Sequence, residues 1–395
     1  MIWLDLRMVK VLLRTSVALA IIFTLTACAT VHEFFDDTVY ELPPAELIEF
    51  TPEFDPKIVW SVNTGGADND YTDLAVWILG DMIVAVDYEG EVSSYDVQTG
   101  RRLWKVDLDV DVTTGAGGGD GLILIGTQKG EILALDQTNG MLNWRVQLSS
   151  EVLAPPKAAM GVVVARTSDG RLYGMSTTDG HIMWNYQRAV PLLSLRGAGT
   201  PVLVDDKVIA GFANGKLAAL SISDGKVIWE TNVAVARGRT EMDRLVDVDS
   251  EPVIRNNRVY AVSYHGQLVA MDLDTGEKLW SRDMSSRTGL DVDPDNAIYV
   301  TDEDGYVWAL HDGTGDALWR QTRLLRRKVS APIIAGNYIL VGDFEGYIHW
   351  ISREDGRFVA RKEIADGAIR SKPVLKDDLV FITGVDGTLT AIQVQ

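Results

Sequence analysis

The stretch Gly266-Gln-Leu-Val-Ala-Met-Asp-Leu-Asp-Thr-Gly-Glu-Lys-Leu-Trp280 is the unit from which most of this chain is built. Copies aligned on its first glycine are separated by 40, 40, 45, 51, 39, 41 and 41 residues, and they begin at Gly90, Gly130, Gly170, Gly215, Gly266, Gly305, Gly346 and Gly387. A period of about 40 residues with strand-like patterning is typical of one four-stranded blade of a β-propeller. The sequence therefore predicts an all-β fold of repeated four-stranded antiparallel blades.

Each position of the unit has a physical role. The residue two places after the first glycine is always aliphatic, as a core-facing strand position requires. The residue four places after it is usually small, which we expect to let neighbouring sheets approach closely. A second glycine, such as Gly276, follows Thr, Asn or Asp and supplies the positive φ of a tight hairpin.

A tryptophan ends six of the copies, and the seventh has Ala360 instead. Burial of one tryptophan removes roughly 150–250 Å² from water, a gross gain of about 4–6 kcal/mol. We therefore expect these rings to pack one blade against the next. The predicted packing residues are Trp104, Trp144, Trp184, Trp229, Trp280 and Trp319, together with Trp60 described below.

The last copy predicts how the chain ends meet. Only eight residues follow Gly387, so its second glycine and its tryptophan are missing. Residues 57–63, with Trp60, read as a lone strand near the N-terminus. We expect this strand to become the outermost strand of the blade formed by residues 371–395, because pairing would protect two open edges. The fold prediction is an eight-bladed β-propeller whose ring is closed by this N-terminal strand.

The first 27 residues have the pattern of a targeting signal, with a basic start, an apolar run and Leu25-Thr-Ala-Cys28. This ending resembles a bacterial lipobox, which implies cleavage before Cys28 and lipidation of its thiol; the alternative is an ordinary secretory signal with an incidental cysteine. Either Met1 or Met8 suits as the start. Ala29 after the cysteine favours the outer membrane. We assign residues 1–27 to the signal, 28–56 to a lipidated, flexible tether and 57–395 to the propeller.

The charge of the chain excludes some partners. The formal net charge is −19, and removal of residues 1–27 leaves −21, because three basic residues and one acidic residue leave with them. Binding of nucleic acid needs clustered Lys and Arg, so we expect no nucleic-acid partner. For the same reason, lipid chains rather than surface charge should provide membrane anchoring.

Three patterns that suggest chemistry have simpler interpretations. The five histidines stand singly, so we predict no metal site and no catalytic residue. Residues 115–121, rich in glycine, open no helix and read as a loop between strands. Residues 291–302 resemble a calcium loop, but Asn296 stands where glycine is needed, so a solvated turn is the better interpretation.

The repeat also resembles the tryptophan-docking motif of quinoprotein dehydrogenases, propellers that hold pyrroloquinoline quinone and calcium. Those enzymes are longer and typically carry two adjacent cysteines, whereas Cys28 is the only cysteine here. We therefore predict no cofactor and no enzymatic activity.

The two long spacings are consecutive and predict two neighbouring loops on one face. The first loop contains Pro191-Leu-Leu-Ser-Leu-Arg-Gly197, and the second contains residues 240–249, which are acidic. Apolar side chains beside an arginine are typical of a binding hot spot. Equally open is that the leucines tuck under their own loop and the carboxylates are solvated.

These loops, together with Gly342-Asp-Phe-Glu-Gly-Tyr-Ile-His-Trp350 and residues 354–360, resemble the BamB family. The resemblance covers essentially the whole chain, and Trp350 and Ala360 fit the seventh-blade pattern of that family. It implies a non-catalytic lipoprotein of the outer-membrane β-barrel assembly machinery, facing the periplasm. Its implied partners are the POTRA domains of BamA, other subunits of the machinery and unfolded outer-membrane clients. The implied partner-binding residues are Leu193, Leu195, Arg196, Asp247 and Asp249, with both aspartates at an exposed rim; another periplasmic protein-binding propeller is the alternative.

Overall fold

The computed structural model describes residues 42–66, 74–188, 199–235 and 246–394. The chain divides into two compact units, 1–43 and Pro44–Gln395, and the fold below is that of the second. All regular structure in the described ranges is β-strand. Within those ranges, no helix has the length and apolar character needed to cross a membrane.

The strands are short and are bounded by tight turns. The first sixteen are β1 (Ile58–Asn63), β2 (Trp77–Leu79), β3 (Met82–Val86), β4 (Glu91–Asp96), β5 (Arg102–Asp107), β6 (Gly117–Gly119), β7 (Leu122–Gly126), β8 (Glu131–Asp136), β9 (Leu142–Gln147), β10 (Lys157–Ala159), β11 (Val162–Arg166), β12 (Arg171–Ser176), β13 (Ile182–Gln187), β14 (Val202–Val204), β15 (Lys207–Gly211) and β16 (Lys216–Ser221).

The remaining strands are β17 (Val227–Asn232), β18 (Val253–Arg255), β19 (Arg258–Val262), β20 (Gln267–Asp272), β21 (Lys278–Asp283), β22 (Gly289–Val292), β23 (Ala297–Thr301), β24 (Val307–His311), β25 (Ala317–Gln321), β26 (Ile333–Ala335), β27 (Tyr338–Gly342), β28 (Tyr347–Ser352), β29 (Phe358–Glu363), β30 (Val374–Lys376), β31 (Leu379–Thr383) and β32 (Thr388–Gln393).

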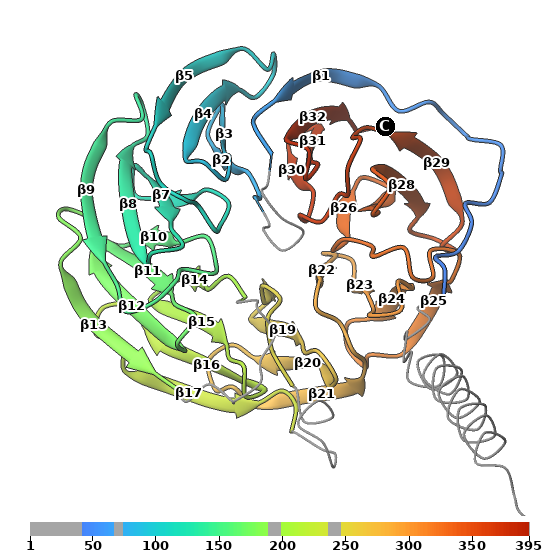
Figure 1. The fold of residues 1–395 in the computed structure, drawn as a ribbon. Helices are drawn as coiled ribbons and strands as arrows, with labels where there is room; N and C mark the ends of the chain where they lie inside the picture. The colour runs from blue at the N-terminus through green and yellow to red at the C-terminus, as the bar shows by residue number, and fades with distance from the viewer. Residues whose placement is uncertain (1–41, 67–73, 189–198, 236–245, 395) are drawn as a thin grey trace, which may run out of the picture. The chain divides into compact units, whose positions relative to one another are not determined.

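These strands form antiparallel groups of four that follow one another in chain order, as expected for a β-propeller (Figure 1). Six groups are separate sheets. The groups β6–β9 and β10–β13 share one eight-stranded sheet, joined by a parallel pair between Lys157 and Gly118. The glycines of β6 make this join possible. A Cβ atom on Gly117 would lie 2.0 Å from Pro156 O, and one on Gly119 would lie 1.9 Å from Ala158 O.

The N-terminal strand β1 lies at the outer edge of the sheet β1-β32-β31-β30, where Trp60 pairs with Ala391. Gln393 N donates a further hydrogen bond of 3.0 Å to Lys57 O. Trp60 and Phe381 of this sheet share a buried cluster with Ile83 and Tyr95 of the β2–β5 sheet. The first and last strands of the fold thus belong to one sheet, which packs on the next sheet in the series.

The small residue of the repeat and its tryptophan are cross-strand partners within one blade. Ala270 lies opposite Trp280, and Gly174 lies opposite Trp184, whose ring would be 2.0 Å from a Cβ atom on that glycine. The small residue therefore makes room for the ring of its own blade, a different reason from the close approach of sheets that the sequence suggested. On β28 and β29 the pair is reversed, with Trp350 opposite Ala360.

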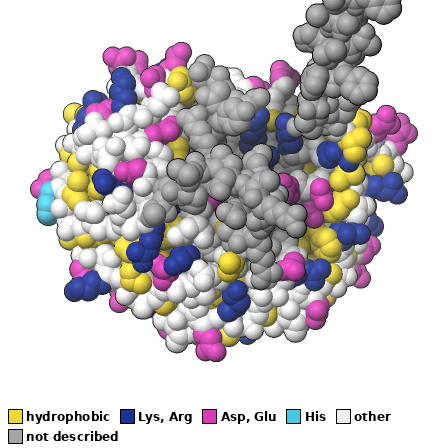
Figure 2. Space-filling view, turned by 60° about the horizontal axis from the view of Figure 1, so that its bottom comes forward, with side chains coloured by type: hydrophobic (Ala, Val, Ile, Leu, Met, Phe, Trp, Pro, Cys, Tyr) yellow, Lys and Arg dark blue, Asp and Glu magenta, His cyan; other side chains and the backbone are white. Residues whose placement is uncertain are grey.

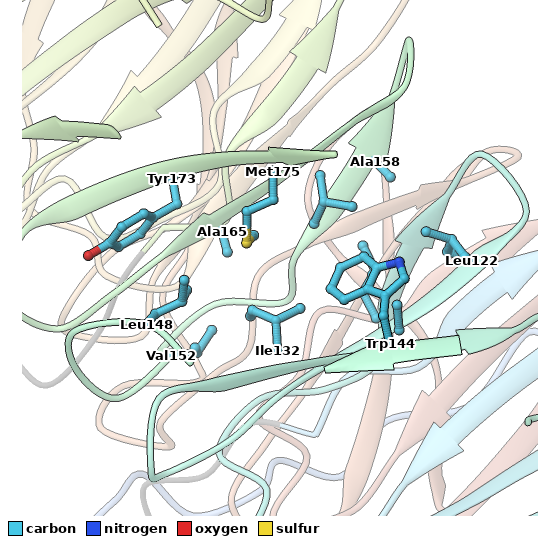
Figure 3. Close-up of a cluster of buried hydrophobic side chains, with 12 residues drawn as sticks. Leu122, Ile132, Trp144, Leu148, Val152, Ala158, Ala165, Tyr173 and Met175 are labelled. Atoms are coloured by element: carbon cyan, nitrogen blue, oxygen red, sulfur yellow. The ribbon is translucent and has the colours of Figure 1, made fainter. Parts of the chain in front are cut away.

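Buried side chains from adjacent groups fill the space between them. Figure 3 shows one such cluster, in which Ile132 and Trp144 from β8 and β9 face Ala165 and Met175 from β11 and β12. Trp144 is only 8% exposed, and Met175 is fully buried. Each blade thus completes its core only in contact with its neighbour.

Two interpretations from the sequence need correction. Residues 115–121 are not only a loop, because Gly117–Gly119 form the innermost strand β6 of their group. Residues 293–296 do form the turn between β22 and β23, with Asn296 at φ 76°, but this turn is not simply solvated. Asp293 is 2% exposed because it pairs with the guanidinium of Arg353.

The folded unit begins at Pro44, so part of the segment expected to be a flexible tether belongs to it. Residues 44–56 run along the outer side of the β26–β29 sheet, seen in blue beside β29 in Figure 1. Phe50 stacks on Phe358 with ring centroids 5.7 Å apart. Apolar residues at positions 47, 48, 50 and 54 account for this packing, since each contacts a buried cluster of the neighbouring sheets.

Candidate functional site

The two inserted loops are described at their C-terminal ends. Leu193, Leu195 and Arg196 lie outside the described residues, as does the first part of the second loop. The described parts begin again at Gly199 and at Val246, and both lead into the first strand of a sheet, β14 and β18.

The described ends of the two loops meet. A Cβ atom on Gly199 would lie 2.7 Å from Ser250 O and 3.1 Å from Asp249 O. Val248 is held by a hydrogen bond from its N–H to Phe212 O (3.3 Å), and Tyr264 N donates to Asp247 O (2.8 Å). Segments about 50 residues apart in sequence therefore pack against each other at this point.

A buried arginine lies beside the second loop end. Arg166 closes β11, is 4% exposed, and places its guanidinium 5.5 Å from the ring centroid of Phe212. It attracts both Asp249 and Asp247 electrostatically. This arginine was absent from the candidates chosen by sequence, and its only signal was a charge ending the apolar run Val162-Val-Val-Ala-Arg166.

The carboxyl groups of both aspartates are buried. Asp247 is 1% exposed. Both carboxylate oxygens of Asp249 are buried and have no hydrogen-bond partner among the described residues. Burial raises the pKa of Asp249 to about 7, while Arg166 acts to lower it and Asp247 to raise it. Burial of this carboxyl group therefore disfavours its charged form.

The exposed rim expected for both aspartates is therefore not what the structure contains. The physical reason is the attraction of Arg166, which makes it possible to bury Asp247 and the carboxylate of Asp249 beneath the loop ends. The structure thus brings Asp247 and Asp249 together with Arg166.

The repeat tryptophans pack against the hairpin glycine of the following blade. A Cβ atom on Gly276 would lie 2.5 Å from Trp229 Cδ2, and one on Gly100 would lie 2.6 Å from Trp60 Cδ2. Most of the indole N–H groups also donate to a backbone carbonyl of that blade. These bonds are Trp60 to Val97 O (3.0 Å), Trp144 to Thr177 O (2.9 Å), Trp184 to Ile222 O (2.8 Å), Trp229 to Leu273 O (2.9 Å), Trp280 to Asp312 O (2.7 Å) and Trp319 to Arg353 O (2.8 Å).

Trp104 departs from this pattern. Its ring lies against Gly140, where a Cβ atom would be 2.7 Å away, but its buried N–H has no hydrogen-bond partner among the described residues.

The described residues hold no group of three or more His, Cys, Asp or Glu side chains arranged to bind a metal ion. Cys28 lies outside them. On the face in Figure 2, acidic, basic and apolar side chains are interspersed across the described surface. The chemistry of the described site is thus that of a buried arginine and two carboxylates beneath a pair of loops.

Comparison with known sequences identifies the family. The family model described as outer membrane protein assembly factor BamB matches residues 88–321 and 310–395. A Pseudomonas aeruginosa protein of the same name is 46% identical over 356 residues, which cover 90% of this chain and 93% of the relative. The Escherichia coli protein of that name is 34% identical over 368 residues, covering 90% and 93% of the two chains.

Comparison with solved structures agrees. The crystal structure of BamB from Moraxella catarrhalis has a TM-score of 0.79 at 30% identity, covering 86% of this chain and 99% of that one. A quinohemoprotein alcohol dehydrogenase from Comamonas testosteroni has a TM-score of 0.67 at 12% identity, covering 86% of this chain and 76% of that one, which reflects the fold alone. On the family match and these identities, the chain belongs to the family of the outer membrane protein assembly factor BamB.

Proposed function

We propose that this chain is a non-catalytic scaffold lipoprotein of the outer-membrane β-barrel assembly machinery. In this proposal it binds the POTRA domains of BamA and assists the folding and insertion of β-barrel proteins. The observation that carries it is the identity of 46% with an assembly factor over 90% of the chain. The Escherichia coli protein, which has the same name, supports the same assignment.

The anchor belongs to the same proposal. Cleavage before Cys28 and lipidation of its thiol would hold the protein at the outer membrane, facing the periplasm. The eight groups of four strands would be eight blades of a ring that β1 closes by pairing with β32. Such a ring offers a rigid frame on which two adjacent loops keep a fixed spacing.

We place the contact with BamA on the two inserted loops. Leu193 and Leu195 would lose water on docking, and Arg196 would select the orientation of the partner by charge. Asp247 and Asp249, being buried beside Arg166, would support the loop from below rather than pair at its rim. The meeting of the loop ends at Gly199 and Ser250 supports a single surface.

Binding of the mature chain without its lipid to the purified POTRA region of its own BamA tests the proposal. Saturable binding is expected, and the variant Leu193→Ala with Arg196→Glu should lose at least about tenfold in affinity, equivalent to about 1.4 kcal/mol. The matched control Leu103→Ala with Arg102→Glu changes the same residue types on the outer strand β5, where Leu103 is 38% exposed. Equal binding by both variants would remove the loops from the interface, and no binding by the unchanged chain would contradict the scaffold role.

A further inference from the structure

Residues 44–56, called the strap from here on, connect three consecutive sheets. At one end Ala45 N donates to Leu325 O (2.9 Å), in the connection between β25 and β26, and Arg327 Nη1 donates to Ala45 O (3.0 Å). At the other end the chain enters β1 beside β32. Between these points the strap crosses the outer side of the β26–β29 sheet (Figure 1).

Two aromatic side chains fix the middle of the strap. Phe50 stacks on Phe358 at an interplanar angle of 24°. Phe54 meets the ring of Trp350 edge-on, with centroids 6.3 Å apart and an angle of 87°. Trp350 is the residue that reverses the usual pairing of a small residue with tryptophan, so this blade departs from the repeat where the strap covers it.

The outer strand under the strap has an unusual burial pattern. The first two residues of β9, β13 and β17 are exposed, whereas Phe358 and Val359 of β29 are buried. Glu53 N donates to Val359 O (2.8 Å), which satisfies a carbonyl at the edge of this sheet. The strap therefore closes an edge that corresponding strands leave open.

Backbone carbonyls of the strap also complete a buried polar network. Arg361 donates from Nη1 to Ile48 O (3.1 Å) and from Nε to His349 Nδ1 (3.1 Å). The other ring nitrogen of His349 then carries the hydrogen and donates to Asp343 Oδ2 (2.9 Å). Arg327 is 2% exposed and also donates to Asp343. Release of the strap would leave N–H groups of both arginines without their acceptors, which favours the docked state.

We infer that the strap ends the tether at Pro44, so that a lipid anchor at Cys28 holds the side of the molecule with β26–β29 toward the membrane. This inference rests on the anchor proposed above. Sixteen residue steps separate Cys28 from Pro44, and a fully extended chain of that length reaches at most about 50–60 Å. If the strap were not docked, the extended chain from Cys28 to Lys57 would reach about 95–105 Å. A tether of that length would not fix the orientation of the folded unit relative to the membrane.

Hydrogen exchange on the chain without lipid tests whether the strap is docked. The amides of Ala45 and Glu53, which have acceptors in the structure, should be protected. The variant Phe50→Ser with Phe54→Ser should lose protection at these amides by about tenfold or more, while amides of β28 stay protected. The matched control Glu46→Ser with Glu49→Ser changes exposed positions of the same strap and should leave protection unchanged.

Energy transfer from the lipidated chain to a membrane dye in vesicles tests the orientation. One label replaces Glu363 on β29, and a second replaces Met141, which is 67% exposed beside β9 on the opposite side of the ring (Figure 1). Transfer should be stronger from position 363, and release of the strap by the Phe50 and Phe54 substitutions should abolish this difference.

The outcomes separate the two proposals. Equal transfer from both positions in the unchanged chain, or a difference that survives release of the strap, would overturn the inference and leave the scaffold function intact. A full-length chain whose Cys28 carries no lipid by mass spectrometry would instead contradict the anchor itself.

Discussion

Substitution of Gly276 by alanine would test two reasons for glycine at the hairpin positions. One is the positive φ of the backbone, and the other is the close contact with the tryptophan ring of the neighbouring blade. Gly276 has φ 68°, and a Cβ atom would lie 2.5 Å from Trp229 Cδ2. A left-handed conformation costs a residue with a side chain about 1–2 kcal/mol. Displacement of a packed ring adds about 1–3 kcal/mol, and loss of the 2.9 Å bond from Trp229 Nε1 to Leu273 O adds about 1 kcal/mol. The free energy of unfolding should fall by about 3–6 kcal/mol.

Gly161 is the matched control for this substitution. Its φ is 80°, but no atom lies within 4 Å of the position where a Cβ would be. Gly161→Ala should therefore lose only the backbone contribution of about 1–2 kcal/mol. The difference between the two variants isolates the contact between blades.

Urea unfolding followed by tryptophan fluorescence measures both losses, provided that the slope of free energy against urea is the same in each variant. Trp229→Phe introduced with Gly276→Ala should cost less than the sum of the single substitutions, because the smaller ring relieves the contact. Equal losses for Gly276→Ala and Gly161→Ala would refute the steric argument and leave only the requirement for positive φ.

Three further outcomes are expected. Trp350→Ala should cost about 3–5 kcal/mol in urea unfolding, and combination with Ala360→Trp should recover part of this by restoring the usual pair. Burial lowers the pKa of the His349 side chain. Neutral His349 therefore stabilises the fold at pH values above 6.5, the usual pKa of histidine, and this contribution is lost as the pH falls below 6.5. Between pH 7 and pH 5, the stability of His349→Gln should therefore fall less steeply than that of the unchanged chain. Burial raises the pKa of Asp249 to about 7. The contribution of this residue to stability is therefore complete below about pH 4, where the carboxyl group is protonated in both the folded and the unfolded chain, and it is lost as the pH rises through about 7. Between pH 5 and pH 8, Asp249→Asn should therefore become more stable relative to the unchanged chain.

The repeat itself predicted the strands well, because each of its positions depends on local geometry. The aliphatic positions lie in buried strands, and the hairpin glycines have positive φ, as at Gly276. The pairing of residues 58–63 with β32 was also readable, since a lone strand and an incomplete blade stand at opposite ends of the sequence.

Other contacts between distant segments were not readable from the sequence. The strap has no strand periodicity, and its partners on β28 and β29 lie about 300 residues away. The buried Asp247 is attracted by Arg166, which belongs to the distant strand β11. The strand β6 was missed because three successive glycines carry no hydrophobic pattern, although their lack of side chains is what allows the contact with β10.

Because β1 pairs with β32, the sheet that contains both can form only after the last residues of the chain have been synthesised and exported. A chain that is synthesised and exported from its N-terminus releases Trp60 long before its partner Ala391. Until then β1 has an open edge, and contacts of such long sequence separation form slowly. Loss of only the last eight residues would remove all of β32, leaving β1 without its strand partner and β31 paired only with β30. The C-terminal strand β32 is therefore required before the N-terminal strand β1 can pair in its sheet.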